Sequence, residues 1–177
     1  MASNLDIQFG VDTPGTRSLR VGRWSEQNAC YHLIANVKDK LPLLTGPVAD
    51  LVIKHLSRLP EVCDFHLLAF VVMPDHVHLL GTLQGTLSIS EVMGRWKKHS
   101  GREINRYLER TGPFWQAGYY DRRIRNEGEL GELVNYVHLN PVTSELVDRP
   151  EDWKHSSLQG EYRTRLTGWW KLGYRSQ

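Results

Sequence analysis

The stretch DFHLLAFVVMPDHVHLLGTL, residues 64–83, decides the fold of this chain. Its first half is a continuous apolar run with several β-branched and aromatic residues, which is typical of a buried strand. Pro74 and Asp75 are turn residues, and a second apolar run follows them over residues 76–83. The stretch therefore predicts a β-hairpin whose two strands are joined by a tight turn.

The flanking segments predict three helices and two more strands. Residues 30–37 and the aromatic-rich residues 114–125 are typical of strands. Residues 47–59 have apolar residues at helical spacing, and residues 88–110 begin with a Ser88–Glu91 capping box. Residues 127–140 predict a further helix with an apolar face, which Pro141 is expected to end.

The resulting order of elements is β-α-β-β-α-β followed by an extra helix, which predicts an α+β fold. This order is typical of the ferredoxin-like (RRM-like) arrangement, an antiparallel sheet with helices on one face. The additional C-terminal helix carries Tyr136. We expect one domain over residues 29–158, an irregular N-terminal arm over residues 1–28 and a C-terminal tail over residues 159–177.

Composition places the chain among cytoplasmic proteins. It has 177 residues, of which 40% are hydrophobic and 24% charged. No apolar run approaches the ~18 residues of a membrane span, and no leader pattern precedes the first strand. Cys30 and Cys63 fall within predicted strands and are interpreted as free buried thiols.

Two histidines, His76 and His78, follow the predicted turn at a spacing of two residues. Residues at this spacing in a strand point to the same face of the sheet, which suits two imidazoles binding one divalent ion. The alternative is a pair of neutral histidines packed in the core. Tyr136 and Asn140 lie one turn apart on one flank of the C-terminal helix, where they can face the histidines together. An exposed tyrosine and a helix-ending asparagine would produce the same pattern.

Three motifs, FVVMPDHVHLL, FWQAGYYDRRIR and VNYVHLNPV, together resemble those of the REP-associated tyrosine transposases. These are single-tyrosine HUH nucleases, related to small insertion-sequence transposases, and the resemblance covers residues 28–158. It implies that His76, His78 and Asn140 bind a divalent ion, Mg²⁺ or Mn²⁺, and that Tyr136 is the nucleophile. Asn140 stands where related transposases often have Gln, and Asp75 where many have Asn.

The resemblance also implies a reaction and a substrate. The reaction is cleavage and rejoining of single-stranded DNA through a 5′-phosphotyrosine, on hairpin-containing DNA such as REP sequences. The partner is therefore hairpin DNA. The short connection to the tyrosine helix favours a monomer, while a homodimer stays open.

DNA contacts are expected from a basic segment. Residues 91–125 hold nine Lys or Arg against four Asp or Glu, and phosphate contacts require such positive charge. The predicted DNA-binding residues are Arg95, Lys98, Arg102, Arg106, Arg122, Arg123, Arg125 and, by stacking on bases, Trp115. A solvated helix face and a core tryptophan are the alternatives.

Other functions remain open from the sequence. The chain is alternatively a DNA-hairpin-binding protein with weak catalysis, or a hydrolase that uses water and needs no tyrosine. A ferredoxin-like RNA-binding module is a further alternative, but it requires exposed aromatic residues on its central strands. Tyr119 and Tyr120 are rival nucleophiles to Tyr136, and a structural or DNA-stacking role is expected for them instead.

Overall fold

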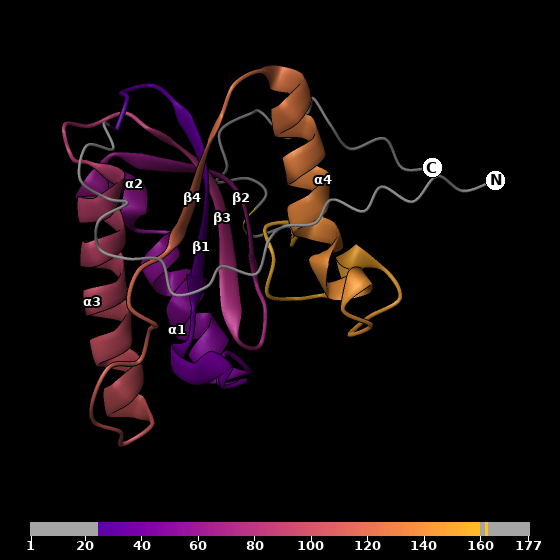
Figure 1. The fold of residues 1–177 in the computed structure, drawn as a ribbon. Coiled ribbons are helices and arrows are strands. Elements are labelled where there is room, and N and C mark those ends of the chain that lie inside the picture. Colours follow the sequence, from indigo (N-terminus) through magenta and orange to yellow (C-terminus); the bar gives the residue numbers. More distant parts are fainter. Residues whose placement is uncertain (1–24, 160–161, 163–177) are drawn as a thin grey trace.

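Four antiparallel strands form the centre of the structure, a computed structural model that describes residues 25–159 and 162 (Figure 1). The strands are β1 (Cys30–Asn36), β2 (Phe65–Val72), β3 (His76–Leu83) and β4 (Tyr120–Ile124), in the sheet order β2-β3-β1-β4. The predicted hairpin is confirmed, because β2 pairs with β3 and the Met73 amide donates to the His76 carbonyl across the turn at 2.8 Å. The α+β class and the antiparallel sheet are confirmed with it.

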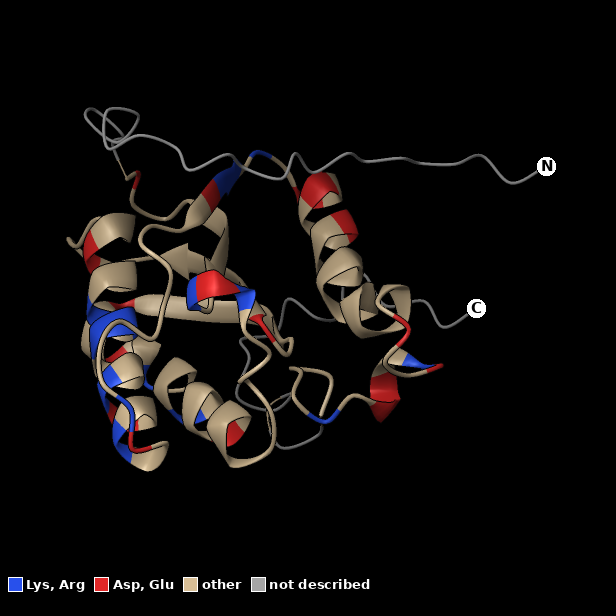
Figure 2. Cartoon of the chain, turned by 60° about the horizontal axis from the view of Figure 1, so that its bottom comes forward, with Lys and Arg blue, Asp and Glu red and all other residues tan. Residues whose placement is uncertain are grey.

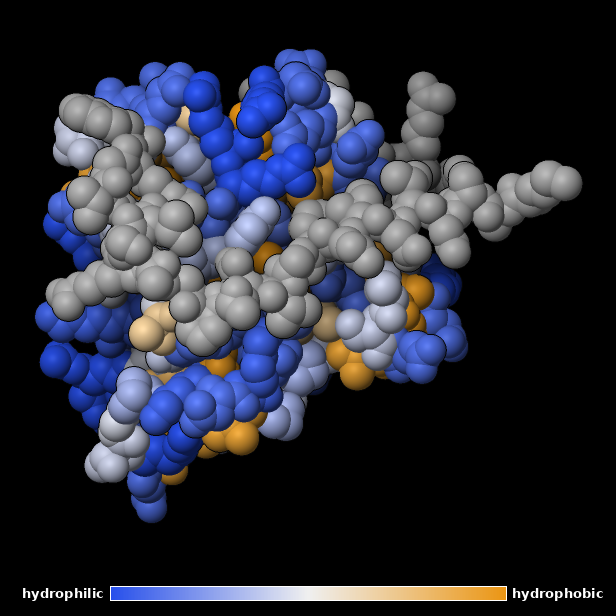
Figure 3. Space-filling model, viewed as in Figure 1, coloured by the Kyte–Doolittle hydropathy of each residue, from blue (hydrophilic) through white to orange (hydrophobic). Residues whose placement is uncertain are grey.

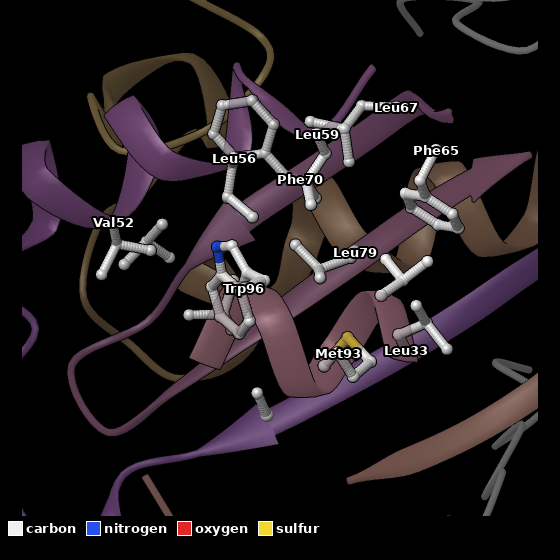
Figure 4. Close-up of a cluster of buried hydrophobic side chains, with 14 of the residues drawn as sticks. Leu33, Val52, Leu56, Leu59, Phe65, Leu67, Phe70, Leu79, Met93 and Trp96 are labelled. Carbon is white, nitrogen blue, oxygen red and sulfur yellow. The ribbon is translucent and has the colours of Figure 1, made fainter. Parts of the chain in front are cut away.

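Helices cover both faces of this sheet (Figure 1). Helices α1 (Pro47–Leu56), α2 (Leu59–Cys63) and α3 (Ile89–Tyr107) pack on one face, and α4 (Glu127–Thr143) packs on the other. Because side chains alternate along each strand, the sheet supplies one apolar layer to each side. The larger layer includes Leu33, Phe65 and Leu79 (Figure 4), and the smaller one joins Val71 and Leu80 to the apolar face of α4.

The helix starts follow their sequence signals. Ser88 and Glu91 form the predicted capping box at the start of α3, with each side chain bonded to the other residue's backbone amide. Asn126 caps α4 by accepting from the Glu129 amide. The apolar face predicted for the last helix is confirmed, because Leu133 and Val137 are buried against the sheet. Apolar side chains reach the surface only in small separate patches in the view of Figure 3.

The predicted strand over residues 114–125 is shorter than expected. Only Tyr120–Ile124 pairs continuously with β1, while Trp115 makes an isolated bridge to Val37. Gly118, with a φ of 85°, lies between the two paired pieces. A left-handed residue of this kind cannot continue a pleated strand, so the segment divides there.

Trp115 packs into the core, and the predicted stacking of its ring on DNA bases stays a prediction. The side chain is 6% exposed and packs against Trp96, with ring centroids 4.9 Å apart. Its indole N–H donates to the Ser100 hydroxyl at 3.0 Å. Gly101 allows this close packing, because a Cβ at that position would come within 3.2 Å of the Trp115 ring.

Pro141 does not end the last helix, contrary to prediction. Helix α4 continues to Thr143, and its C-cap residue Ser144 still donates to the Asn140 carbonyl at 3.0 Å. A proline inside a helix removes one donor, to the carbonyl four residues earlier, which here is that of Val137. The predicted placement of Cys63 in a strand is also wrong, since it ends α2. Both cysteines are nevertheless free, as predicted.

The segment after α4 returns to the sheet. After a short 3₁₀ helix (Pro150–Asp152), residues 155–157 run along the outer side of β2, where Ser156 forms an antiparallel bridge with Val71. The Trp153 indole donates to the Val72 carbonyl at 3.0 Å, so this tryptophan packs on the domain as predicted. The predicted tail lies almost wholly outside the described residues, as does most of the N-terminal arm. No helix in the described ranges has the length and apolarity to cross a bilayer.

Candidate active site

His76 and His78 project from β3 toward α4, side by side as the sequence predicts. Their Nε2 atoms lie 3.0 Å apart, and their ring planes are inclined by 70°. Burial lowers the pKa of both imidazoles, and for His78 the lowering is large. Both rings are therefore neutral near pH 7, which is the state in which histidine binds a metal ion.

The geometry of this pair fits a divalent ion. With metal–nitrogen distances of about 2.1 Å, an Nε2–Nε2 separation of 3.0 Å corresponds to an angle of roughly 90° at the metal, as in octahedral sites. The Asp75 carboxylate accepts from His76 Nδ1 at 2.5 Å, which leaves the lone pair of His76 on Nε2. Among the described residues, no group of three His, Cys, Asp or Glu side chains could hold a metal.

Tyr136 lies directly beside the histidines. Helix α4 places its ring edge-on to His78, with the centroids 5.6 Å apart. Burial raises the pKa of the Tyr136 phenol above its ordinary value of 10; a hydrogen bond to Asn140 opposes this rise, and the neighbouring Tyr120 adds to it. A phenol with a raised pKa is a weak nucleophile at neutral pH and needs an activating group beside it.

Asn140 lies one helical turn after Tyr136, as predicted. Its side-chain amide donates to the Tyr136 carbonyl at 2.9 Å. The structure gives Asn140 a hydrogen bond to Tyr136 and none to His76 or His78. The role of Asn140 as a metal ligand therefore stays a prediction.

His32 is a member of this cluster that the sequence did not reveal. It lies on β1, is fully buried, and its Nε2 is 3.0 Å from His78 Nδ1. Burial, with a smaller effect of the Arg122 charge, lowers the pKa of His32 to about 4. His32 pairs with Leu80 in the register of the sheet, two residues from His78 on the same face. The available sequence signal was only a polar residue in an otherwise apolar strand.

Tyr120 also lies near the site. Its ring is 6.1 Å from that of His32, and its phenol contributes to the raised pKa of Tyr136. Tyr119 is elsewhere, bonded through its hydroxyl to Ser90 at 2.7 Å. Of the three tyrosines considered from the sequence, only Tyr136 packs directly against a histidine of the predicted metal pair.

A basic groove runs between α3 and the loop that follows it, and we call it the α3 groove. It has a volume of about 690 Å³ and an apolar floor that includes Phe114. Lys and Arg residues along α3 mark this side of the molecule in Figure 2. The cationic residues that line the α3 groove are Lys97, Lys98, Arg102, Arg106 and Arg110.

The other predicted DNA-binding arginines lie outside the α3 groove. Arg95 instead lines a smaller pocket between α2 and α3, of about 230 Å³, with Arg58. Arg122 and Arg123 on β4 form ion pairs with Glu129 at 2.6 Å and with Glu26 at 2.8 Å. The backbone amide of Arg125 donates to Glu129. The predicted basic surface is therefore divided: Lys98, Arg102 and Arg106 line the α3 groove, and the other predicted arginines lie elsewhere.

Comparison with known proteins agrees with this arrangement. Residues 25–140 match the family described as "Transposase IS200 like". The chain belongs to this family. The transposase is 31% identical to the REP-associated tyrosine transposase of Escherichia coli strain K12 over 140 residues, which are 77% of this chain and 80% of that protein. The resemblance found in the sequence motifs is confirmed.

A solved structure shares the fold. It is the structure of a REP-associated tyrosine transposase bound to a REP hairpin, with a TM-score of 0.68 and 22% sequence identity. The match covers 88% of this chain and 90% of that one. At this identity the likeness shows the arrangement of the elements, and the assignment of the site residues rests on their own geometry.

Proposed function

We propose that this transposase cleaves and rejoins single-stranded DNA at hairpins, with Tyr136 as the nucleophile and a divalent ion held by His76 and His78. The contact that carries the proposal is the edge-on packing of Tyr136 on His78, with ring centroids 5.6 Å apart. It brings a phenol beside a neutral histidine pair whose Nε2 atoms can share one ion.

The covalent step forms one bond and breaks one. The Tyr136 oxygen attacks the scissile phosphorus and loses its proton, a P–O bond to the tyrosine forms, and the bond to the 3′ oxygen breaks. The departing oxygen takes up a proton and becomes a free 3′-hydroxyl. The 5′-phosphotyrosine keeps the phosphodiester energy, so attack by another 3′-hydroxyl rejoins the strand and releases Tyr136.

A metal ion is required because the Tyr136 phenol, with its raised pKa, is a weak nucleophile at neutral pH. When bound, Mg²⁺ or Mn²⁺ polarises the phosphate and stabilises the developing charge. His76 and His78 would hold the ion through Nε2, with the Asn140 amide oxygen as a third ligand. Mixed nitrogen and oxygen ligands with a phosphate substrate favour these two ions.

The α3 groove is the proposed contact for the DNA backbone. It gathers cationic residues from the C-terminal half of α3 and the following loop, beside apolar side chains that include Phe114. Arginines and lysines arranged in this way neutralise successive phosphates. The related solved structure is bound to a REP hairpin, and we propose the same class of substrate for this chain.

The site is proposed to work within one chain. Helix α4 packs on β2 and β3 of its own sheet and brings Tyr136 against His78 of the same chain. This supports the predicted monomer. The strand order β2-β3-β1-β4 supports the ferredoxin-like assignment of the fold.

The decisive experiment looks for DNA attached to the protein. A labelled single-stranded REP-type hairpin is incubated with the protein in Mg²⁺ or Mn²⁺ and run on a denaturing gel, comparing wild type with Tyr136→Phe. Tyr120→Phe is the matched control, because it removes a neighbouring phenol. We expect a protein-linked band with wild type and Tyr120→Phe, and none with Tyr136→Phe, which still binds DNA.

Three other results would contradict the proposal. A linked band that depends on Tyr120 would make that residue the nucleophile. Free cleaved product from both wild type and Tyr136→Phe would indicate a hydrolase that uses water. Intact hairpin binding with no cleavage in either metal would indicate a binding protein.

A further inference from the structure

We propose that His32 is a positioning residue for metal binding, because it accepts the proton that His78 must carry on Nδ1 when Nε2 binds the ion. The inference rests on the proposed metal site. It adds a buried partner that holds His78 in the tautomer that can bind a metal through Nε2. No sequence motif points to His32.

The geometry of the pair is that of an in-plane hydrogen bond. His32 Nε2 lies 3.0 Å from His78 Nδ1, the two ring planes are 13° from parallel, and the ring centroids are 5.3 Å apart. Neither side chain is more than 2% exposed. Water is therefore kept from this contact, and each nitrogen depends on the other for its partner.

The number of protons on each imidazole then determines which ring donates in this hydrogen bond. A neutral imidazole carries one proton, on either Nδ1 or Nε2. When His78 gives the lone pair of Nε2 to a metal, its proton lies on Nδ1, and the partner found there is His32 Nε2. His32 must accept that proton, so it carries its own on Nδ1.

Each metal-binding histidine thus has its own second partner. His76 donates from Nδ1 to Asp75, and with Nε2 on the metal His78 would donate from Nδ1 to His32. Outer partners of this kind fix ring orientation and tautomer, and their loss typically costs 10–100-fold in metal affinity. The same bond excludes His32 Nε2 as a ligand of this ion. His32 Nε2 faces Nδ1 of His78, whereas the ion would bind Nε2 of His78.

Two substitutions of His32 distinguish a role as hydrogen-bond acceptor for His78 from a role in filling space in the core. His32→Gln places an amide oxygen close to the position of Nε2 and keeps an acceptor for His78. His32→Leu has a similar volume and no acceptor. His66→Leu is the matched control, because His66 pairs with Thr82, four residues along β3 from His78.

The readout is Mn²⁺ affinity measured by electron paramagnetic resonance on the protein alone, with thermal unfolding followed for each variant. We expect His32→Leu to weaken Mn²⁺ binding by about 10–100-fold, and His32→Gln and His66→Leu to bind like wild type. Equal affinity of His32→Leu and wild type would overturn the positioning role and leave the metal site standing. Wild-type binding as weak as that of His78→Ala would overturn the metal site itself, and the role of His32 with it.

A measurement on wild type covers the case in which His32→Leu does not fold. Imidazole ¹⁵N spectra in saturating Mg²⁺ report which nitrogen of each histidine carries the proton. We expect the proton of His78 on Nδ1 and that of His32 on Nδ1. A proton on Nε2 of His78 in the Mg²⁺-loaded protein would overturn the proposal.

Discussion

The ring of Tyr136 on α4 stands edge-on to the ring of His78 on β3, with their planes at 80°. The two residues are far apart in the sequence and come from adjacent layers of the domain, the sheet and the helix that packs on it. Their contact depends on the packing of α4 against the sheet, so any change that shifts this helix is expected to act on catalysis.

Asp75 is expected to control metal affinity through His76. Replacing Asp75 with Ala removes the acceptor of the His76 Nδ1 proton, which lies 2.5 Å away, and should weaken Mn²⁺ binding by about 10–100-fold. Asp75→Asn keeps a carbonyl oxygen as acceptor and should lose much less. Isothermal titration with Mn²⁺ measures both. Equal losses in the two variants would mean that the charge of Asp75, not its hydrogen bond, is what matters.

The α3 groove is expected to set the salt dependence of hairpin binding. The double variant Arg102→Ala with Arg106→Ala should weaken binding and reduce the slope of log K against log salt by about one for each phosphate that is no longer neutralised. Fluorescence anisotropy with a labelled hairpin at several salt concentrations measures this slope. Arg58→Ala with Arg95→Ala removes the same charge from the smaller pocket and serves as the control. A larger effect of the control pair would place the DNA elsewhere.

Stability is expected to fall as the pH is lowered from about 6.5 to 4. The pKa of His32 is about 4 in the folded chain against 6.5 for the free group. The unfolded state therefore binds more protons in this window, and the free energy of unfolding rises with pH. At 1.36 kcal/mol per pH unit, His32 alone accounts for about 3 kcal/mol. Urea denaturation across this range tests the prediction, and His32→Leu should flatten the dependence. A pH-independent free energy of unfolding would contradict it.

Ser157 is expected to hold α4 in place. Its hydroxyl lies 2.8 Å from His138 Nε2 on α4 and accepts from the Phe70 amide at 2.9 Å on β2. Ser157→Ala leaves these buried groups without their partner and should cost about 1–3 kcal/mol. Ser144→Ala, on the exposed end of the same helix, should be nearly neutral. Chemical denaturation compares the two, and equal stability of the variants would show that this contact does not hold the helix.

The hairpin and the apolar helix faces could be predicted because their signals are local. The apolar patterns, the turn residues and the Ser88–Glu91 capping box each act over a few positions. The folded structure keeps the elements that these local signals predict. Pro141 was mispredicted as the end of the helix because packing overrode the local signal, and packing also selected the core position that the sequence had left as an alternative for Trp115. Helix α4 continues through Pro141 although that residue has no N–H to donate. The Trp115 ring packs closely against α3 at Gly101, where no side chain is in the way.

The site was predictable only in part. The spacing of His76 and His78 placed both on one face, and the motif resemblance singled out Tyr136. His32 could not be found in this way, because its meeting with His78 depends on the register of β1 against β3. The ion pairs of Arg122 and Arg123 likewise depend on where Glu129 and Glu26 come to lie.

The bridge between Ser156 and Val71 has a consequence for how the molecules behave in solution. It covers part of the free edge of β2, where unpaired backbone groups would otherwise offer a template to another chain. The opposite edge, β4, is only five residues long and carries the exposed, ion-paired side chains of Arg122 and Arg123, and short edge strands with charged side chains are poor templates for pairing. One outer strand is covered by another segment of the chain, and the other is short and lined by charged side chains. Both features discourage the edge-to-edge pairing through which sheet proteins aggregate.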